Sequence, residues 1–253
     1  MHSQRVLPVR AMHYFLAALI AASTMDGASA AGLDQANAGL AAAERGEFDE
    51  AIRLFSAALA AGDLSPGNAV IAIHNRGNAF QDKGDYRNAI TQYDTEIRMK
   101  PNGPEGYYAR GRARFSVGEF AGATTDFVRS LTFDPSDAYS VLWLYLTRSK
   151  TGQGSGTELQ ANAAKLDLSH WPGPLVNLYL ERTTSQLAQM ASLQGDGRMQ
   201  REQSCEAAFY IGEYELMRKN GDEAKTLFRQ AVKNCPFLSD ERDGATAELK
   251  RTP

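Results

Sequence analysis

The chain has 253 residues, of which 43% are hydrophobic, 23% charged and 9% aromatic, a balance typical of a folded globular protein and not of a disordered or collagen-like one. Its 27 Lys and Arg against 30 Asp and Glu give a net charge of −3, which does not favour general binding to nucleic acid. No apolar run approaches the roughly 20 residues of a membrane-spanning helix. Four His and two Cys leave little material for a metal site.

The first thirty residues indicate export. Arg5 and Arg10 precede a short apolar stretch (FLAALIAAS, 15–23), and a triplet of small residues ends at Ala30. This order of features is typical of a secretory signal peptide. We therefore expect a signal peptide over 1–30, cleavage after Ala30 and a periplasmic protein. No Cys precedes Cys205, so we expect no lipid anchor.

Residues 77–101 and 111–135 carry the same pattern at a constant offset of 34 residues. Glycine, aromatic, alanine and proline positions all recur at that offset, which is the period of the tetratricopeptide repeat, a helix–turn–helix unit. Small residues let two antiparallel helices approach closely, aromatic side chains fill the space beside them, and proline ends the second helix. The recurring pairs are Gly77/Gly111, Gly84/Gly118, Tyr86/Phe120, Ala89/Ala123, Tyr93/Phe127 and Pro101/Pro135.

Two further copies fit the pattern, one around Gly39 and Phe55 and one around Gly212 and Phe228. The chain thus resembles the tetratricopeptide family. We expect an all-α fold, a right-handed superhelical solenoid of about five to six repeats with a C-terminal capping helix, and no β-strands. The expected organisation is three repeats over 31–137, degenerate repeat helices over 138–204, and a last repeat with the capping helix over 205–253. The degenerate helices are expected at 139–148, 158–166, 175–182 and 184–192.

Two positions depart from the repeat pattern. Glu96 and Ser130 stand where the first and last repeats have Ala58 and Ala231. Either the middle repeats pack less tightly at these positions, or they use the polar groups at the interface between repeats.

The second half narrows the resemblance. The segment 139–146 (YSVLWLYL) is followed by Trp171-Pro172-Gly173 with VNLYL, and then by 208–214 (AFYIGEY). In this order the segments resemble the periplasmic tetratricopeptide lipoproteins called new lipoprotein I. The resemblance implies a non-catalytic adaptor, often a homodimer, that tethers a periplasmic tail-specific protease and peptidoglycan hydrolases. The missing lipid-attachment motif departs from that family.

The two cysteines are expected to pair. In repeat coordinates Cys205 stands at the start of the first helix of the last repeat, and Cys235 just past the end of the second. Antiparallel helices bring these two points together, and an exported protein meets an oxidising compartment. The alternative is two inert thiols.

Candidate binding residues follow from the resemblance to related repeats, in which the first helix of each unit lines a concave groove. The expected groove residues are His74, Asn78, Gln81, Tyr108, Arg112 and Phe115. The alternative for Phe115 is that it packs between repeats. The alternative for Tyr108 is that it lies on the surface without a binding role. No catalytic constellation, cofactor-binding motif or metal-ligand spacing is found, so we expect no catalytic residues and no cofactors.

Three hypotheses about function remain. The first is a non-catalytic scaffold that binds proteins or peptides in the groove, with the protease and cell-wall hydrolases as partners. The second is a structural subunit of an envelope assembly or export complex. A cell-wall hydrolase ranks last, because no pair of carboxylates at a defined cleft can be identified.

Overall fold

The structure is a computed structural model that describes residues 31–237 and 239–252. These residues form thirteen α-helices and no β-strand, which confirms the all-α class. None of these helices is long and apolar enough to cross a membrane. The signal peptide and its cleavage site lie outside the described residues. The helices are α2 (Ala31–Glu44), α3 (Phe48–Ala61), α4 (Pro66–Asp82), α5 (Tyr86–Met99), α6 (Glu105–Ser116), α7 (Phe120–Phe133), α8 (Ala138–Lys150), α9 (Gly156–Ala163), α10 (Gly173–Tyr179), α11 (Ser185–Ala191), α12 (Gly197–Met217), α13 (Gly221–Asn234) and α14 (Asp240–Arg251).

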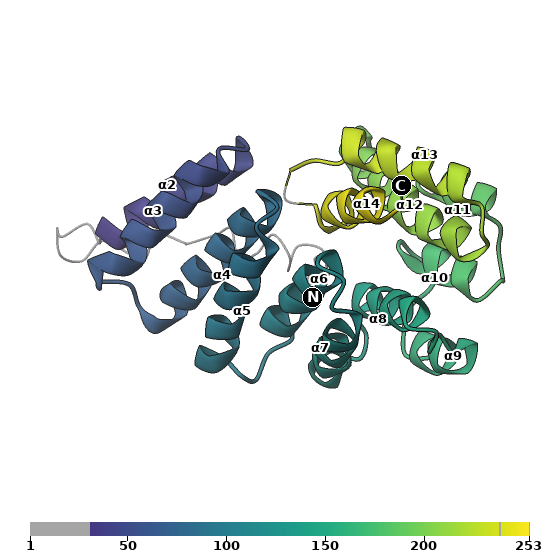
Figure 1. Ribbon diagram of the computed structural model, residues 1–253, viewed down its shortest axis with the longest axis horizontal. Coiled ribbons are helices and arrows are strands. Elements are labelled where there is room, and N and C mark those ends of the chain that lie inside the picture. Colours follow the sequence, from purple (N-terminus) through teal and green to yellow (C-terminus); the bar gives the residue numbers. More distant parts are fainter. Residues whose placement is uncertain (1–30, 238, 253) are drawn as a thin grey trace, which may run out of the picture.

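The first six helices pair as three hairpins, α2–α3, α4–α5 and α6–α7, which stack one after another along the solenoid (Figure 1). Within each hairpin a glycine lets the two helices approach. A Cβ atom on Gly77 would lie 2.6 Å from Cε1 of Tyr93, so the ring packs directly on bare backbone. The α12–α13 hairpin repeats this contact between Gly212 and Phe228, at 2.7 Å. The glycine and the aromatic residue that recur in each repeat of the sequence are therefore the two residues that touch where the helices of a hairpin cross.

The turn inside each hairpin needs a left-handed backbone conformation. Gly84 has a φ of +85° and Gly118 a φ of +81°, values that glycine adopts without steric cost. At the corresponding turn of the last hairpin Lys219 takes φ +67°. The same turn is thus made there without glycine, which is why the last repeat matches the sequence pattern less well.

The middle of the chain does not form full repeats. The four expected helices are present as α8 to α11, but α9 has 8 residues and α10 and α11 have 7 each. Helices of two turns cannot form the contacts of a tetratricopeptide hairpin, whose helices here have 12 to 17 residues in α3 to α7. Helix α8 instead packs against α7 and contacts α9, while α10 and α11 contact each other and α12.

Helix α12 begins earlier than the repeat pattern predicts. It starts at Gly197 and runs for 21 residues, because the side chain of Asp196 caps it by accepting hydrogen bonds from the backbone N–H groups of Arg198 and Met199. Cys205 therefore lies inside the helix and not at its start, and the expected boundary between 204 and 205 falls within α12. The first helices of the other repeats have no such N-terminal extension of two turns, so the repeat pattern did not predict it.

The two polar departures from the pattern lie at repeat interfaces. Glu96 is buried and its Oε2 lies 2.8 Å from Nδ1 of His74, while its side chain also packs against the backbone of Gly106 on the next hairpin. Ser130 is buried and pairs with the hydroxyl of Ser140 on α8 at 3.1 Å. Ser130 thus uses its polar group between repeats, whereas the carboxylate of Glu96 bonds within its own hairpin and only packs against the next one.

Trp143 on α8 is the centre of the largest apolar cluster. It is fully buried, and its ring centroid lies 4.9 Å from that of Phe115, 5.1 Å from Phe209 and 6.0 Å from Phe127. These partners come from α6, α12 and α7. One side chain thus joins the N-terminal hairpins to the C-terminal hairpin.

A buried group of charges also joins separate parts of the chain. Nζ of Lys150 on α8 lies 2.9 Å from Oε2 of Glu213 on α12 and 3.0 Å from Oε2 of Glu248 on α14. Arg251 forms a second ion pair with Glu248 at 2.6 Å. Burial, followed by the negative charge of Glu248, raises the pKa of Glu213 from 4.5 to about 7.

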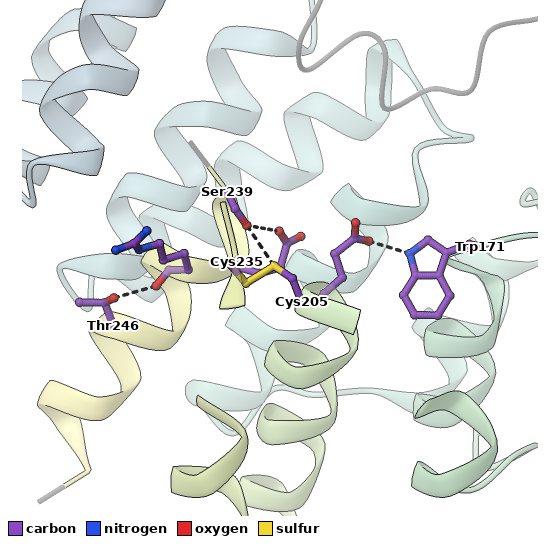
Figure 2. Close-up of a disulfide and its surroundings, with 8 residues drawn as sticks. Trp171, Cys205, Cys235, Ser239 and Thr246 are labelled. Atoms are coloured by element: carbon purple, nitrogen blue, oxygen red, sulfur yellow. Dashed lines mark hydrogen bonds between the residues drawn. A yellow bond between two sulfur atoms is a disulfide. The ribbon is translucent and has the colours of Figure 1, made fainter. Parts of the chain in front are cut away.

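Cys205 and Cys235 form a disulfide, with Cα atoms 5.0 Å apart, which agrees with the expected pairing. Figure 2 shows that Ser239 lies beside it: Oγ is 3.5 Å from Sγ of Cys205 and donates a hydrogen bond to Glu241 at 2.9 Å. The disulfide therefore holds α12 to the short connection between α13 and α14.

The disulfide should stabilise the C-terminal hairpin without being required for its formation. It closes a loop with a sequence separation of 30, for which the chain-entropy relation gives about 3–4 kcal/mol. We expect the double variant Cys205→Ser/Cys235→Ser to lose about that much free energy of unfolding in urea and to keep its helical circular dichroism. Reduced wild-type protein is the control and should match the variant. Two titratable thiols in denatured, non-reduced protein would contradict the assignment.

The elevated pKa of Glu213 should make stability depend on pH. Between about 4.5 and 7 the folded chain keeps a proton on this carboxyl that the unfolded chain has lost, so the free energy of unfolding falls as the pH rises through that range. We expect Glu213→Gln to flatten the fall in melting temperature between pH 5 and pH 8. Glu215→Gln, on the same helix but only partly buried, is the matched control and should keep the wild-type slope.

Candidate functional site

Helix α14 does not simply extend the end of the solenoid. It contacts α6 and α12 as well as α13, and in Figure 1 it lies between the N-terminal hairpins and α12. The first helices of successive hairpins, α4 and α6, turn side chains toward it. We call the surface formed by Gln81, Tyr108 and Arg112 the concave face.

Arg112 and Tyr108 of the concave face converge on one carboxylate of α14. Nη1 of Arg112 forms an ion pair with Oδ1 of Asp240, and the hydroxyl of Tyr108 donates a hydrogen bond to Oδ2 of Asp240 at 3.1 Å. The guanidinium also lies over the Tyr108 ring, 5.1 Å from its centroid. Only 6% of Arg112 is exposed. Burial is the largest single influence and lowers its pKa, but the nearby acidic groups, Asp240 first among them, together outweigh burial, so the net pKa of Arg112 is raised.

Gln81 binds the next carboxyl along α14. Its Nε2 donates a hydrogen bond of 2.9 Å to Oδ2 of Asp243. Burial, together with the nearby charge of Asp82, raises the pKa of Asp243 well above its usual range. Asp240 and Asp243 are three residues apart and thus lie on one face of the helix. The concave face therefore contacts a pair of carboxyl groups one helical turn apart.

The other three expected groove residues are placed differently. Phe115 is buried against Trp143, with Arg251 of α14 over its ring at 5.0 Å. His74 is buried beside Glu96, and Asn78 accepts a hydrogen bond of 2.7 Å from the hydroxyl of Tyr93 on α5.

Three of the six candidates thus meet at α14 through polar groups, Phe115 meets it through its ring, and His74 and Asn78 bond to α5. A peptide-binding role for these residues stays a prediction. Sequence reasoning missed Asp240 and Asp243, although an acidic first turn in the expected capping helix was a visible signal.

The concave face directs its polar side chains at carboxyl groups. An arginine, a phenol and an amide all direct hydrogen-bond donors at the same helix, and all three side chains are buried. Among the described residues, no group of three or more His, Cys, Asp or Glu side chains is arranged to hold a metal ion. The arrangement fits binding of an acidic segment.

Comparisons with known proteins agree with this architecture. A family model described as TPR repeat matches residues 77–118. A lipoprotein NlpI homolog of Haemophilus influenzae is 31% identical over 170 residues, which cover 66% of this chain and 54% of that protein. The Hsp70-Hsp90 organizing protein of Triticum aestivum is 34% identical over 105 residues, or 41% of this chain and 17% of that protein. The chain thus spans about half the length of the first relative and much less of the second.

Two solved structures share the fold. A thermophilic TPR protein of Thermus thermophilus aligns with a TM-score of 0.50 and 19% identity, over 87% of this chain and 100% of that one. A tetratricopeptide repeat protein of Parabacteroides merdae aligns with a TM-score of 0.52 and 14% identity, over 84% and 83% of the two chains. With the family match, the relatives and the stacked hairpins, the chain is a tetratricopeptide-repeat protein that resembles the lipoprotein NlpI.

Proposed function

We propose that this chain is a non-catalytic adaptor that binds other proteins through its tetratricopeptide solenoid. The observation that carries the proposal is the concave face, where Gln81, Tyr108 and Arg112 already hold a helix by side-chain contacts. A surface that binds one helix through such contacts has the geometry to bind another. The relatives named for organising Hsp70 and Hsp90 and for interacting with Hsc70 support protein binding as the use of these repeats.

The finer proposal concerns place and partners. The similarity to a protein named as a lipoprotein supports a role in the cell envelope. A periplasmic protease and peptidoglycan hydrolases are the partner classes that the family resemblance of the sequence implies. The leader over 1–30 supports export. A homodimer is part of the same proposal.

A second candidate function is a structural subunit of an envelope assembly. One observation favours it: four large apolar side chains between 187 and 199 are about half exposed, at 55% for Leu187, 61% for Met190, 53% for Leu193 and 46% for Met199. Several exposed apolar side chains within one short segment are typical of a contact surface.

Export should be visible at the N-terminus of the mature protein. We expect N-terminal sequencing of the chain from its native host to start at Ala31 and the protein to fractionate with the periplasm. A matched variant, Ala28→Arg/Ala30→Arg, should remain uncleaved because signal peptidase requires small side chains at these positions. Mature protein that still begins at Met1 would contradict export.

The two functions can be separated by affinity capture. Wild-type chain and the variant Leu187→Ser/Met190→Ser, whose changes are on the surface, are used to capture proteins from envelope extract of the native host. Proteins bound equally by both support the adaptor, whereas proteins bound only by wild type support the assembly subunit. Neither function survives if no protein is enriched over an unrelated control. The purified chain should release no soluble fragments from peptidoglycan, and release would support the hydrolase.

A further inference from the structure

Helix α14 is poorly equipped to be held by apolar burial. Its sequence, DERDGATAELKR, contains Leu249 as its only large apolar side chain, and its first turn is acidic. A helix that packs on a core through the hydrophobic effect typically carries a continuous apolar stripe. The position of α14 therefore depends strongly on the polar and charged contacts at its two ends.

The contacts at the first turn are specific for carboxyl groups. Asp240 accepts from Arg112 and Tyr108, and Asp243 accepts from Gln81, so three donors on two helices bind two carboxyl groups on one helical face. Arg112 is buried under α14. A segment that covers it removes the water around the guanidinium, and unless that segment brings an anion, the charge is left without a partner. Any segment that takes the place of α14 must thus supply a negative charge at this point.

The contacts at the middle of α14 select for small residues. A Cβ atom on Gly244 would lie 2.7 Å from the Phe209 ring and 3.0 Å from Cη2 of Trp143. Ala245 and Ala247 are buried as well. The site thus accepts a helix whose two carboxyl groups are followed by glycine and alanine, and a larger side chain at the position of Gly244 would collide with the aromatic cluster.

We propose that the concave face, together with Trp143 and Phe209, is a recognition site for an acidic helix of this pattern, and that α14 is its internal ligand. The partner is a protein segment with two carboxyl groups three residues apart followed by small residues, and it binds by replacing α14. This inference rests on the proposed function, because it names the class of segment that the adaptor takes.

The link between α13 and α14 explains how one site can serve both helices. Only residues 235–239 connect them, so α14 is held close to the concave face even when it is released. Such tethering gives a ligand a high effective concentration, and joining two modules typically raises apparent affinity by about 10²–10⁴-fold. A weakly matching segment would therefore not displace α14, whereas a well-matched partner would.

The proposal can be tested with the full chain and one peptide. A protease site is inserted after Phe237 and cut in the folded protein, which leaves α14 bound without a covalent link. The probe is a fluorescent synthetic peptide with the sequence of residues 239–251, and binding is followed by anisotropy. We expect the cut chain to exchange its α14 for the peptide and to bind it about 100-fold more tightly than the uncut chain does.

Changes made in the peptide test the chemistry without any risk to the fold. The peptide with Asp240→Asn and Asp243→Asn should bind at least about tenfold more weakly, since charge-assisted hydrogen bonds to Arg112 are among the strong ones. The peptide with Gly244→Leu should also lose binding. Lys250→Gln changes an exposed side chain and keeps both carboxyl groups and the glycine, so this control peptide should bind as the parent does. Equal binding by all four peptides would overturn the proposal.

Other outcomes are equally decisive. A cut chain that never exchanges α14 overturns the idea of a replaceable ligand, even if the intact chain captures proteins and the proposed function holds. A chain that captures no protein yet exchanges the peptide refutes the adaptor and leaves the recognition chemistry in place. If uncut chains carrying different labels exchange α14 with each other and form dimers by light scattering, the occupant is a second copy and the partner proposal is wrong.

Discussion

The arrangement of the molecule depends on one electrostatic constraint: a guanidinium that is 6% exposed must have a counter-charge beside it. Arg112 lies on the inner side of the third hairpin, and in the described part of the chain its ion pair reaches beyond that hairpin. Asp240 supplies that charge from the far end of the chain. This pairing places the first turn of α14, and the missing side chain of Gly244 then lets the helix approach Trp143 and Phe209. This ion pair and this close backbone contact place the first half of the last helix, and the ion pair of Glu248 with Lys150 holds its second half.

The hairpins could be predicted because their determinants are local. Gly77 and Tyr93 are 16 residues apart and contact each other directly. The residues that pack the two helices of a hairpin therefore lie within one repeat. The same holds for the turn at Gly84, whose φ of +85° explains the recurring glycine. Repetition at a fixed offset then reveals the stacking, because each repeat mainly contacts its neighbours. The pairing of Cys205 with Cys235 could be predicted for the same reason, since both residues belong to one hairpin.

Only one side of the candidate site could be predicted from the sequence, because its two sides are far apart along the chain. The resemblance to related repeats assigned Arg112 to the groove, but Asp240 lies 128 residues further on and no repeat spacing connects the two. At His74 the structure adds a contact that the repeat pattern does not contain. The repeat pattern directs it to the groove, yet Glu96, which replaces a small residue of the pattern, binds it within its own hairpin at 2.8 Å. The start of α12 also escaped prediction, because an Asp196 cap is a local signal outside the repeat.

The structure separates two kinds of contact surface, and their physics differs. At the concave face the charged groups are buried, so dissolved salt screens them little and the fit of each carboxyl group to its donor decides which helix binds. Between 187 and 199 the exposed side chains are apolar, and burial of such surface is favourable with any partner of matching shape. Discrimination between partners therefore belongs to the concave face, where a segment without a carboxyl group would leave Arg112 buried and unpaired. In the proposed adaptor, charge at the concave face would select the partner, and apolar contact elsewhere would add affinity.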